Sequence, residues 1–171
     1  MDAVVVAVAQ GAIVLVLLVA LLAWARSPPR GRFELVVGGL LAVVLVALAV
    51  RGASLVWTDP RPFVVDGTTP LFDHPADNGF PSDHTTLAAA VSGLVLAARR
   101  AWGAALLAVT ALIGAARVLA HVHHVPDVVA GLVIGLACAA VAVGVAHVVV
   151  DRTLSQRELH PIGMPGRRRT G

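Results

Sequence analysis

Apolar and polar residues alternate in long blocks along this chain, and the apolar blocks have the length of membrane-spanning helices. Five apolar runs cover residues 4–25, 35–57, 84–98, 101–119 and 127–150. An α-helix needs about 20 residues to cross the hydrocarbon core of a bilayer. The pattern therefore predicts an all-α fold, a polytopic membrane bundle with about five transmembrane helices. The third run is the shortest, which favours a helix enclosed by the other four.

The composition supports a membrane-embedded chain. Hydrophobic residues make up 58% of the 171 positions and charged residues only 13%, whereas a soluble domain has about 25% charged residues. The first run lacks a preceding basic residue and is longer than the core of a signal peptide, so we expect it to remain as a helix. We predict a membrane domain over residues 1–150, followed by a disordered basic tail over residues 151–171.

Arginines are distributed unevenly between the connections. They concentrate at 26–34, at 99–100 and after residue 150, whereas the 58–83 connection is acidic. Basic connections stay in the cytoplasm, which predicts a plasma-membrane protein with a cytoplasmic C-terminus and with the 58–83 and 120–126 loops outside. The pI is near 10.9, but no basic stripe is interleaved with aromatic residues. We therefore expect membrane lipids, and no nucleic acid, as partners.

Three polar motifs lie at the ends of the predicted helices. They are Asp59-Pro60-Arg61-Pro62, Pro81-Ser82-Asp83-His84, and Arg117 followed by His123 and Asp127. In the predicted orientation all three motifs lie on the extracytoplasmic side. Two arginines, two histidines and a carboxylate are sufficient to bind a phosphate, attack it and protonate the oxygen that leaves.

The second motif begins the third predicted helix. Ser82 is a favourable N-cap residue, and a helix N-terminus offers free N–H groups, including that of Asp83, to an anion. His84 in the first turn would be close enough to protonate an oxygen of that anion. A plain helix cap with an incidental histidine is the alternative interpretation.

The third motif has the spacing of a nucleophile and the group that orients it. His123 precedes Asp127 by four residues at the start of the fifth predicted helix. The carboxylate can accept one imidazole N–H and leave the other ring nitrogen free to attack. Alternatively, Asp127 caps its helix while the histidines contact the membrane interface. We expect no metal, because His121, His123 and His124 are too crowded in one turn to face a single ion.

Two arginines in and near the first motif are candidate phosphate ligands. Arg61 lies between two prolines that stiffen the backbone, and its planar guanidinium suits phosphate oxygens. Arg51 lies inside the second apolar run, where a charged side chain is by default a candidate functional residue. Snorkelling of Arg51 to the outer surface is the alternative.

Together these motifs resemble those of the type-2 phosphatidic acid phosphatase superfamily. The superfamily pattern reads Lys-x6-Arg-Pro, then Pro-Ser-Gly-His, then Ser-Arg-x5-His-x3-Asp, and the matching stretches here begin at Arg61, Pro81 and Arg117. The stretches 59–63 and 80–86 are most similar to the bacitracin-resistance type of undecaprenyl-diphosphate phosphatase. This resemblance implies a membrane-embedded enzyme that needs no metal or other cofactor and has its site on the outer face.

The resemblance also implies a role for each matching residue. His123 would be the nucleophile that forms a phosphohistidine, Asp127 would hold its tautomer, and His84 would be the general acid. The remaining matches would bind the transferring phosphoryl group; they are Arg61, Arg117, Ser82 and the backbone N–H of Asp83.

The first two blocks of the pattern contain departures. Ser54 stands in place of the lysine, so the phosphate contact of that lysine is either missing or supplied by Arg51, one turn earlier on the same helical face. Asp83 replaces the glycine, a change that the undecaprenyl-diphosphate branch tolerates. In the third block, Ala116 replaces the serine before the arginine.

The third block also contains a displaced proline. The superfamily has proline two residues after the nucleophile, whereas Pro126 comes three residues after His123. His124 is therefore an alternative nucleophile, and the spacing to Arg117 and Asp127 favours His123.

We therefore expect a lipid phosphatase that converts a polyprenyl diphosphate, such as undecaprenyl or decaprenyl diphosphate, to the monophosphate. The nearest alternative is a phosphatase of the same mechanism acting on phosphatidate or phosphatidylglycerophosphate, because all these lipid tails would meet similar Ala, Val and Leu surfaces. A non-catalytic membrane protein that binds lipid phosphates is a second alternative, favoured by the missing lysine. The sequence leaves the oligomeric state open.

Overall fold

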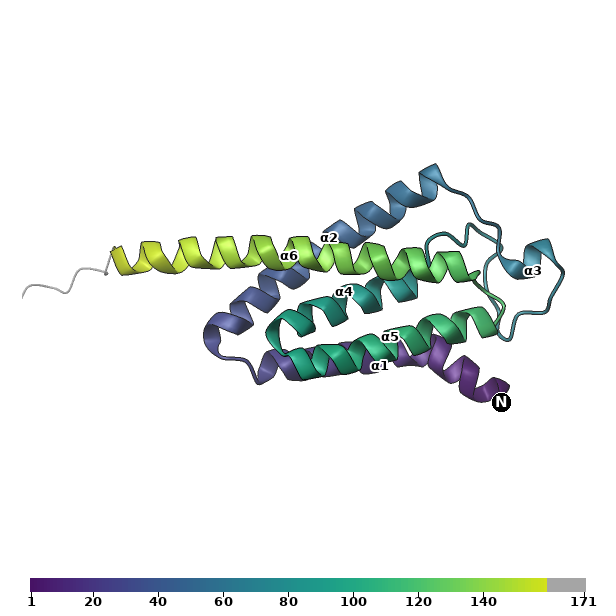
Figure 1. Cartoon of the computed structure of the whole chain (residues 1–171), viewed down its shortest axis with the longest axis horizontal. Coiled ribbons are helices and arrows are strands. Elements are labelled where there is room, and N and C mark those ends of the chain that lie inside the picture. Colours follow the sequence, from purple (N-terminus) through teal and green to yellow (C-terminus); the bar gives the residue numbers. More distant parts are fainter. Residues whose placement is uncertain (160–171) are drawn as a thin grey trace, which may run out of the picture.

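The structure, a computed structural model, describes residues 1–159, and for residues 157–159 it describes only the backbone. Helices joined by short connections and one longer loop make up the described chain (Figure 1). They are α1 (Asp2–Ala25), α2 (Pro29–Val56), α3 (Pro62–Val65), α4 (Asp83–Ala98), α5 (Arg100–Leu119) and α6 (Val125–Leu159). Extended pairing within residues 1–159 is limited to an isolated bridge between Pro60 and Asn78.

Each of the five predicted spans corresponds to one helix, which confirms the all-α membrane bundle. Helices α1, α2, α5 and α6 are long and apolar enough to cross a membrane, and α4 is a shorter apolar helix. Large apolar side chains cover the outer faces, and Leu18, Leu40 and Leu48 are among the most exposed. An apolar surface of this extent marks contact with lipid and not with water.

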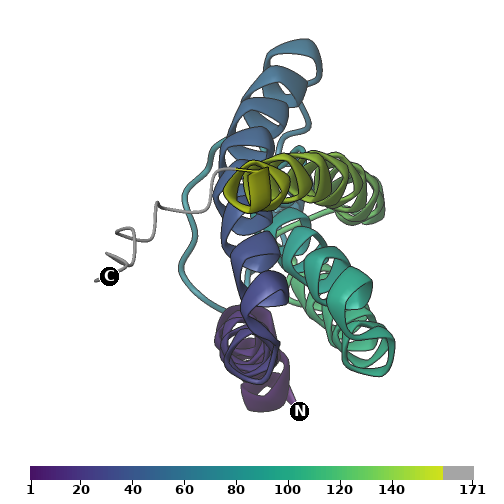
Figure 2. The same ribbon diagram turned by 90° about the vertical axis from the view of Figure 1, so that its left-hand side faces the viewer.

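Helix α4 lies at the centre of the bundle, as its short length predicts. It contacts α1, α2, α5 and α6, and it lies between α5 and α6 in Figure 1. One apolar cluster joins it to α1 and α5 through Val16, Val95 and Ile113. A second cluster joins it to α2 and α6 through Leu94 and Ala142. Figure 2 shows the bundle from the end where α6 terminates, with α2 and α6 crossing.

Helices α4 and α6 approach so closely that only glycine fits between them. A Cβ atom added to Gly135 would lie 2.3 Å from the carbonyl oxygen of Thr86, and one added to Gly131 would lie 2.9 Å from that of Ser82. Small residues let helix backbones pack in this way inside membranes. The approach brings the first turns of the two helices together, where the N–H of Ser82 donates to the carbonyl oxygen of Asp127 at 3.1 Å.

The helix boundaries differ from the sequence prediction where polar residues extend a span. Helix α2 begins at Pro29 and not at residue 35, and α6 continues to Leu159, past the predicted end at residue 150. Hydropathy detects only the apolar part of a helix, whereas Arg30 pairs with Glu34 and Asp151 across both extensions. Residues 151–159 of the predicted tail are thus helical, and the prediction for residues 160–171 lies outside the described residues.

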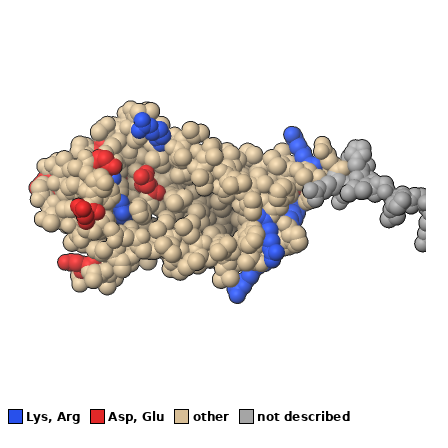
Figure 3. Space-filling model, turned by 180° about the vertical axis from the view of Figure 1, so that it is seen from behind, with Lys and Arg blue, Asp and Glu red and all other residues tan. Residues whose placement is uncertain are grey.

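Acidic side chains predominate at one end of the bundle and arginines at the other (Figure 3). The end where α4 and α6 begin, here called the loop end, carries acidic side chains in its longest loop: Asp59, Asp66, Asp73 and Asp77. The opposite end, here called the arginine end, joins α1 to α2 and α4 to α5. It carries Arg26, Arg30, Arg32, Arg99 and Arg100.

Candidate active site

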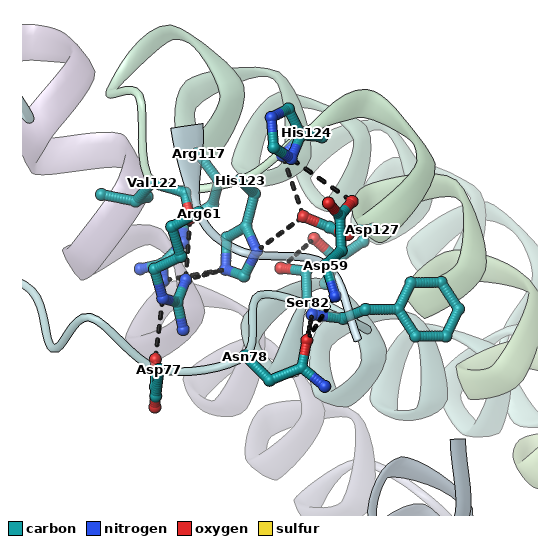
Figure 4. Close-up of polar contacts among 12 residues, drawn as sticks. Asp59, Arg61, Asp77, Asn78, Ser82, Arg117, Val122, His123, His124 and Asp127 are labelled. Carbon is teal, nitrogen blue, oxygen red and sulfur yellow. Dashed lines mark hydrogen bonds and ion pairs between the residues drawn. The ribbon is translucent and has the colours of Figure 1, made fainter. Parts of the chain in front are cut away.

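Residues from two of the three sequence motifs meet around one imidazole at the loop end (Figure 4). The α5–α6 connection provides His123, the first turn of α6 provides Asp127, the last turn of α5 provides Arg117, and the residue before α3 is Arg61. The first and third motifs, more than fifty residues apart in the sequence, are therefore neighbours in space.

The two ring nitrogens of His123 face groups of opposite charge. The residue is 3% exposed. Its Nδ1 lies 3.4 Å from Oδ2 of Asp127, while its Nε2 lies 3.2 Å from Nη2 of Arg117 and 3.3 Å from Nη1 of Arg61. The carboxylate selects the tautomer in which Nδ1 carries the proton. This tautomer leaves the Nε2 lone pair available as a nucleophile.

Arg61 is a buried cation with fixed partners. It is 5% exposed. Its Nε donates to Oδ1 of Asp77 at 2.8 Å, and its Nη1 donates to the carbonyl oxygen of Val122 at 2.7 Å. These bonds hold the planar guanidinium in one orientation beside His123, which is how arginine presents parallel N–H groups to phosphate oxygens.

Arg117 is a second buried cation beside the same imidazole. It is 3% exposed, its Nη2 lies 2.9 Å from Nε2 of His74, and its guanidinium lies over the ring of Phe72. Its Nε is buried and has no hydrogen-bond partner among the described residues. An unsatisfied buried donor is costly, and an oxygen of a bound anion would satisfy it. The two guanidiniums therefore form a site suited to a phosphoryl group.

Asp127 is fully buried and joins the site to the helix packing. Its Oδ2 accepts the backbone N–H of His124 at 2.9 Å, in addition to lying near Nδ1 of His123. Its backbone oxygen accepts the N–H of Ser82, as described above. The close packing of α4 on α6 thus determines where the carboxylate, and through it the imidazole, is placed.

The second motif begins α4 as predicted, although Ser82 does not use its side chain as a cap. Ser82 is the N-cap residue without a side-chain cap bond, because its hydroxyl instead accepts from the Thr85 hydroxyl at 3.1 Å. Asp83 is exposed and His84 is partly buried. The imidazole of His84 makes no hydrogen bond within the described chain.

Arg51 is not part of this cluster. It is exposed on α2 and forms no side-chain hydrogen bond or ion pair with the residues that the structure describes. Ser54, at the position of the superfamily lysine, directs its hydroxyl to the carbonyl oxygen of Arg51. A phosphate contact from Arg51 stays a prediction.

The structure adds three residues of the 58–83 loop to the site. His74 contacts Arg117, Asp77 contacts Arg61, and the side chain of Asn78 bonds to the N–H groups of Asp59 and Phe80 and to the carbonyl oxygen of Trp57. Sequence reasoning assigned none of these three residues to the phosphate site, because this part of the loop has no helical or strand periodicity. Within this loop, only the clustering of polar residues at positions 74, 77 and 78 could have indicated a contribution to the site.

Burial and neighbouring charges determine the protonation of the loop histidines. Burial, together with the positive charges of Arg117 and Arg61, lowers the pKa of His123 despite the opposing hydrogen bond to Asp127. Burial and the charge of Arg61 likewise lower the pKa of His74. Both imidazoles are therefore neutral near pH 7, as a nucleophile and a hydrogen-bond acceptor must be.

Asp59 extends the site on the far side of Asp127. Its Oδ2 lies 3.3 Å from Nδ1 of His124, and donor atoms of Asp59, His124 and Asp127 all lie within 4.8 Å of one another. Such spacing suits either a shared proton or a bound cation. The expected absence of a metal stays a prediction.

Comparison with known proteins gives concordant matches. Residues 35–150 match the model of the PAP2 superfamily. The chain is 32% identical over 136 residues to undecaprenyl-diphosphatase BcrC of Bacillus subtilis (strain 168), which covers 80% of this chain and 70% of that protein. It is 26% identical over 114 residues to the bacitracin transport permease protein BcrC of Bacillus licheniformis, covering 66% of this chain and 56% of that protein.

A solved structure has the same fold. The crystal structure of Aquifex aeolicus LpxE matches with a TM-score of 0.68 at 24% identity, over 84% of this chain and 85% of that chain. At this identity the match extends to the arrangement of helices only. The helical frame around the site is therefore shared with a protein of quite different sequence.

Proposed function

The chain belongs to the PAP2 superfamily, and we propose that it is a membrane lipid phosphatase that hydrolyses a polyprenyl diphosphate, such as undecaprenyl or decaprenyl diphosphate, to the monophosphate. The observation that carries this proposal is the position of His123 between the Asp127 carboxylate and two buried guanidiniums. The name of the Bacillus subtilis relative supports a polyprenyl diphosphate as substrate.

The terminal phosphoryl group would bind between Arg61 and Arg117. Their N–H groups, which now face Nε2 of His123, would turn to the phosphoryl oxygens, and Nε of Arg117 would gain its missing acceptor. The free backbone N–H groups at the start of α4, including that of Asp83, add partial positive charge. This arrangement would neutralise the charge on the transferring group in the transition state.

The reaction would proceed in two in-line steps, with His123 on one face of the phosphorus and the leaving group, then the attacking water, on the opposite face. Nε2 of His123 attacks in line, the bond to the bridging oxygen breaks, and the leaving prenyl phosphate takes a proton from His84. Water then attacks the phosphohistidine, His84 takes a proton from this water, and inorganic phosphate leaves. Throughout, Asp127 accepts a hydrogen bond from the Nδ1–H group of His123 and stabilises the positive charge that forms on the ring.

The charge distribution supports a site on the extracytoplasmic face. The loop end carries the acidic loop and the site, whereas the exposed arginines other than Arg51 lie at the opposite end, as the positive-inside rule requires of a cytoplasmic surface. In this orientation α6 ends in the cytoplasm, and a lipid carrier would be dephosphorylated on the outer leaflet.

An apolar groove supports a substrate with a long hydrocarbon tail. It has a volume of about 310 Å³, lies between α1, α2 and α4, and is lined by residues that include Val46, Leu87 and Val91. Leu87 is one turn of α4 from His84. A lipid whose phosphate is at the site could therefore lay part of its tail in this groove.

The test is a phosphate-release assay on the purified full chain in detergent with EDTA present. We expect turnover of undecaprenyl diphosphate, and a phosphohistidine label, trapped without acid, that disappears in His123→Ala. Higher kcat/KM for phosphatidate or phosphatidylglycerophosphate would assign the alternative substrate. Binding of these lipids without phosphate release would contradict the phosphatase proposal.

A further inference from the structure

Asp59 and Asp127 form a pair of carboxyl groups behind the proposed nucleophile. A carboxylate oxygen of Asp59 lies within 4.8 Å of a carboxylate oxygen of Asp127. Asp127 is fully buried, and the side chain of Asp59 is 25% exposed. Two adjacent carboxylates that are partly removed from water repel each other and do not ionise together readily.

The hydrogen bonding of Asp127 is incomplete. Its Oδ2 accepts from His124 N–H and faces His123, but its Oδ1 is buried and has no donor among the described residues. A buried carboxylate oxygen without a donor carries its full cost of desolvation. One proton held by Asp59 would supply a donor to Asp127 and remove the repulsion between the two carboxyl groups.

The backbone of Asp59 is held in place by the loop that completes the site. Its N–H donates to Oδ1 of Asn78 at 2.9 Å, and its carbonyl oxygen accepts the N–H of Gly79 at 2.8 Å. A Cβ atom on Gly79 would lie 3.1 Å from that carbonyl oxygen and 3.2 Å from Oδ2 of Asp127. The loop therefore packs directly against the orienting carboxylate, and Asp59 is a fixed part of this contact.

We propose that Asp59 is a positioning residue that, as a neutral carboxylic acid, donates a hydrogen bond to Asp127 and keeps Oδ2 of Asp127 directed at Nδ1 of His123. The proposal rests on the phosphatase function proposed above. It gives the acidic residue of the Asp-Pro-Arg-Pro motif a function distinct from that of Arg61, which faces the phosphate.

The groups around Asp59 favour its protonation. Partial burial and the negative charge of Asp127 raise the pKa of Asp59, while the nearby imidazole of His124 opposes this effect. His123 lies on the other side of Asp127. Because the pKa of Asp59 is raised in the folded protein, its stabilising proton is present at low pH and is lost as the pH rises.

Three variants of the full chain test the proposal. Asp59→Asn keeps a donor of the same shape, so we expect kcat within about threefold of the wild type. Asp59→Ala removes the donor, and we expect kcat to fall about 10- to 100-fold, as for other groups that orient a reacting residue, with little change in KM. Asp73→Asn, an exposed residue of the same loop, is the matched control and should leave both constants unchanged.

The pH profile distinguishes positioning from a merely structural contribution. The amide of Asp59→Asn does not lose its proton, so the ratio of its kcat to the wild-type kcat should increase as the pH rises. Equal activity of Asp59→Asn and Asp59→Ala, or a ratio independent of pH, would overturn the proposal. Loss of wild-type activity in EDTA, with recovery on adding Mg²⁺ or Zn²⁺, would also overturn it, because a cation would then join the two carboxylates.

A measurement without substrate separates this proposal from the proposed function. With rising pH, the wild-type Tm in detergent should decrease relative to that of Asp59→Asn, and Asp73→Asn should show no such difference. If the wild type hydrolyses no lipid phosphate, the proposed function fails, while this Tm comparison still decides whether Asp59 holds the proton. A pH-independent Tm difference would contradict the shared proton even in an active enzyme.

Discussion

Arginines gather at both ends of the bundle, but the two ends hold them in different ways. At the loop end, Arg61 and Arg117 are 5% and 3% exposed, and protein groups fix each guanidinium beside His123. At the arginine end, the side chain of Arg30 is 54% exposed and pairs with Glu34 and Asp151, which are themselves partly or largely in water. The same residue type is therefore preorganised at one end and solvated at the other.

This difference shows why charge alone does not identify a site. An exposed ion pair gains little, because water and salt screen it and both side chains lose freedom. A buried cation without a complete set of partners is costly, and Nε of Arg117 is such an incomplete group. The loop end thus carries an uncompensated buried donor that fits the proposed anion site, whereas the arginines of the opposite end are largely in water.

The largest effect should come from removing the proposed nucleophile at the loop end. His123→Ala should lower kcat at least about 10⁴-fold, because no other step can replace the covalent one. His124→Ala should retain far more activity, since its backbone N–H still donates to Asp127. Phosphate release from undecaprenyl diphosphate measures both variants, and the reverse ranking would assign the nucleophile to His124.

The comparison between the two ends predicts unequal effects of the same substitution. Arg117→Ala should lower kcat about 10²- to 10³-fold, as when a preorganised donor to a transition-state oxygen is removed. Arg30→Ala should change kcat by no more than about twofold, because its pairs are exposed. Similar losses at both ends would mean that the overall charge, and not the fixed geometry, determines activity.

The half of α6 near the site should tolerate a larger side chain less well than the half near the arginine end. Gly135→Val places side-chain atoms against the backbone of α4, where even a Cβ would lie 2.3 Å from the oxygen of Thr86. We expect a loss of about 1–3 kcal/mol of stability, the usual cost of overpacking. Gly144→Val, with open space around it, should be neutral. Thermal unfolding in detergent compares them, and equal Tm values would contradict the close contact of α4 and α6.

A smaller effect is expected on the pH profile. Burial and the charges of Arg117 and Arg61 lower the pKa of His123. Its imidazole should therefore become protonated only when the pH falls below about 6.5, the usual pKa of histidine, and the acid limb of the kcat/KM profile should lie below that pH. Arg61→Gln removes one charge and should move the limb upward by at most about one pH unit. The same substrate is used for both proteins, so that its own ionisation affects both profiles equally. An acid limb at the same pH in both proteins would contradict an electrostatic effect of Arg61 on His123.

The smallest effect should come from the ion pairs of the arginine end. Glu34→Gln weakens the contacts with Arg30 and His147, and we expect Tm and kcat to stay unchanged within error because water competes for these groups. A clear decrease in Tm at low salt that vanishes at high salt would show instead that the pairs form a cooperative network.

Several elements of the molecule could be predicted from the sequence because they depend on local composition. The five spans follow from hydropathy, and the central position of α4 follows from its short length. The sequence motifs also identified the pairing of His123 with Asp127, since residues four apart at a helix start lie near one another. The start of α2 and the end of α6 were predicted wrongly, because the first turn of α2 and the last turns of α6 are polar and Arg30 pairs with Asp151 between them.

The sequence by itself determined a membrane bundle, because a bilayer restricts apolar runs to helices. It also determined the chemical groups of each motif, because the residues within one motif are close along the chain. Only the tertiary structure decided that Arg61 reaches His123, that His74 and Asp77 hold the guanidiniums, that Asp59 meets Asp127, and that Arg51 stays outside the cluster. These contacts join segments tens of residues apart, and their geometry depends on how α4 and α6 pack, which is decided only when the helices come together.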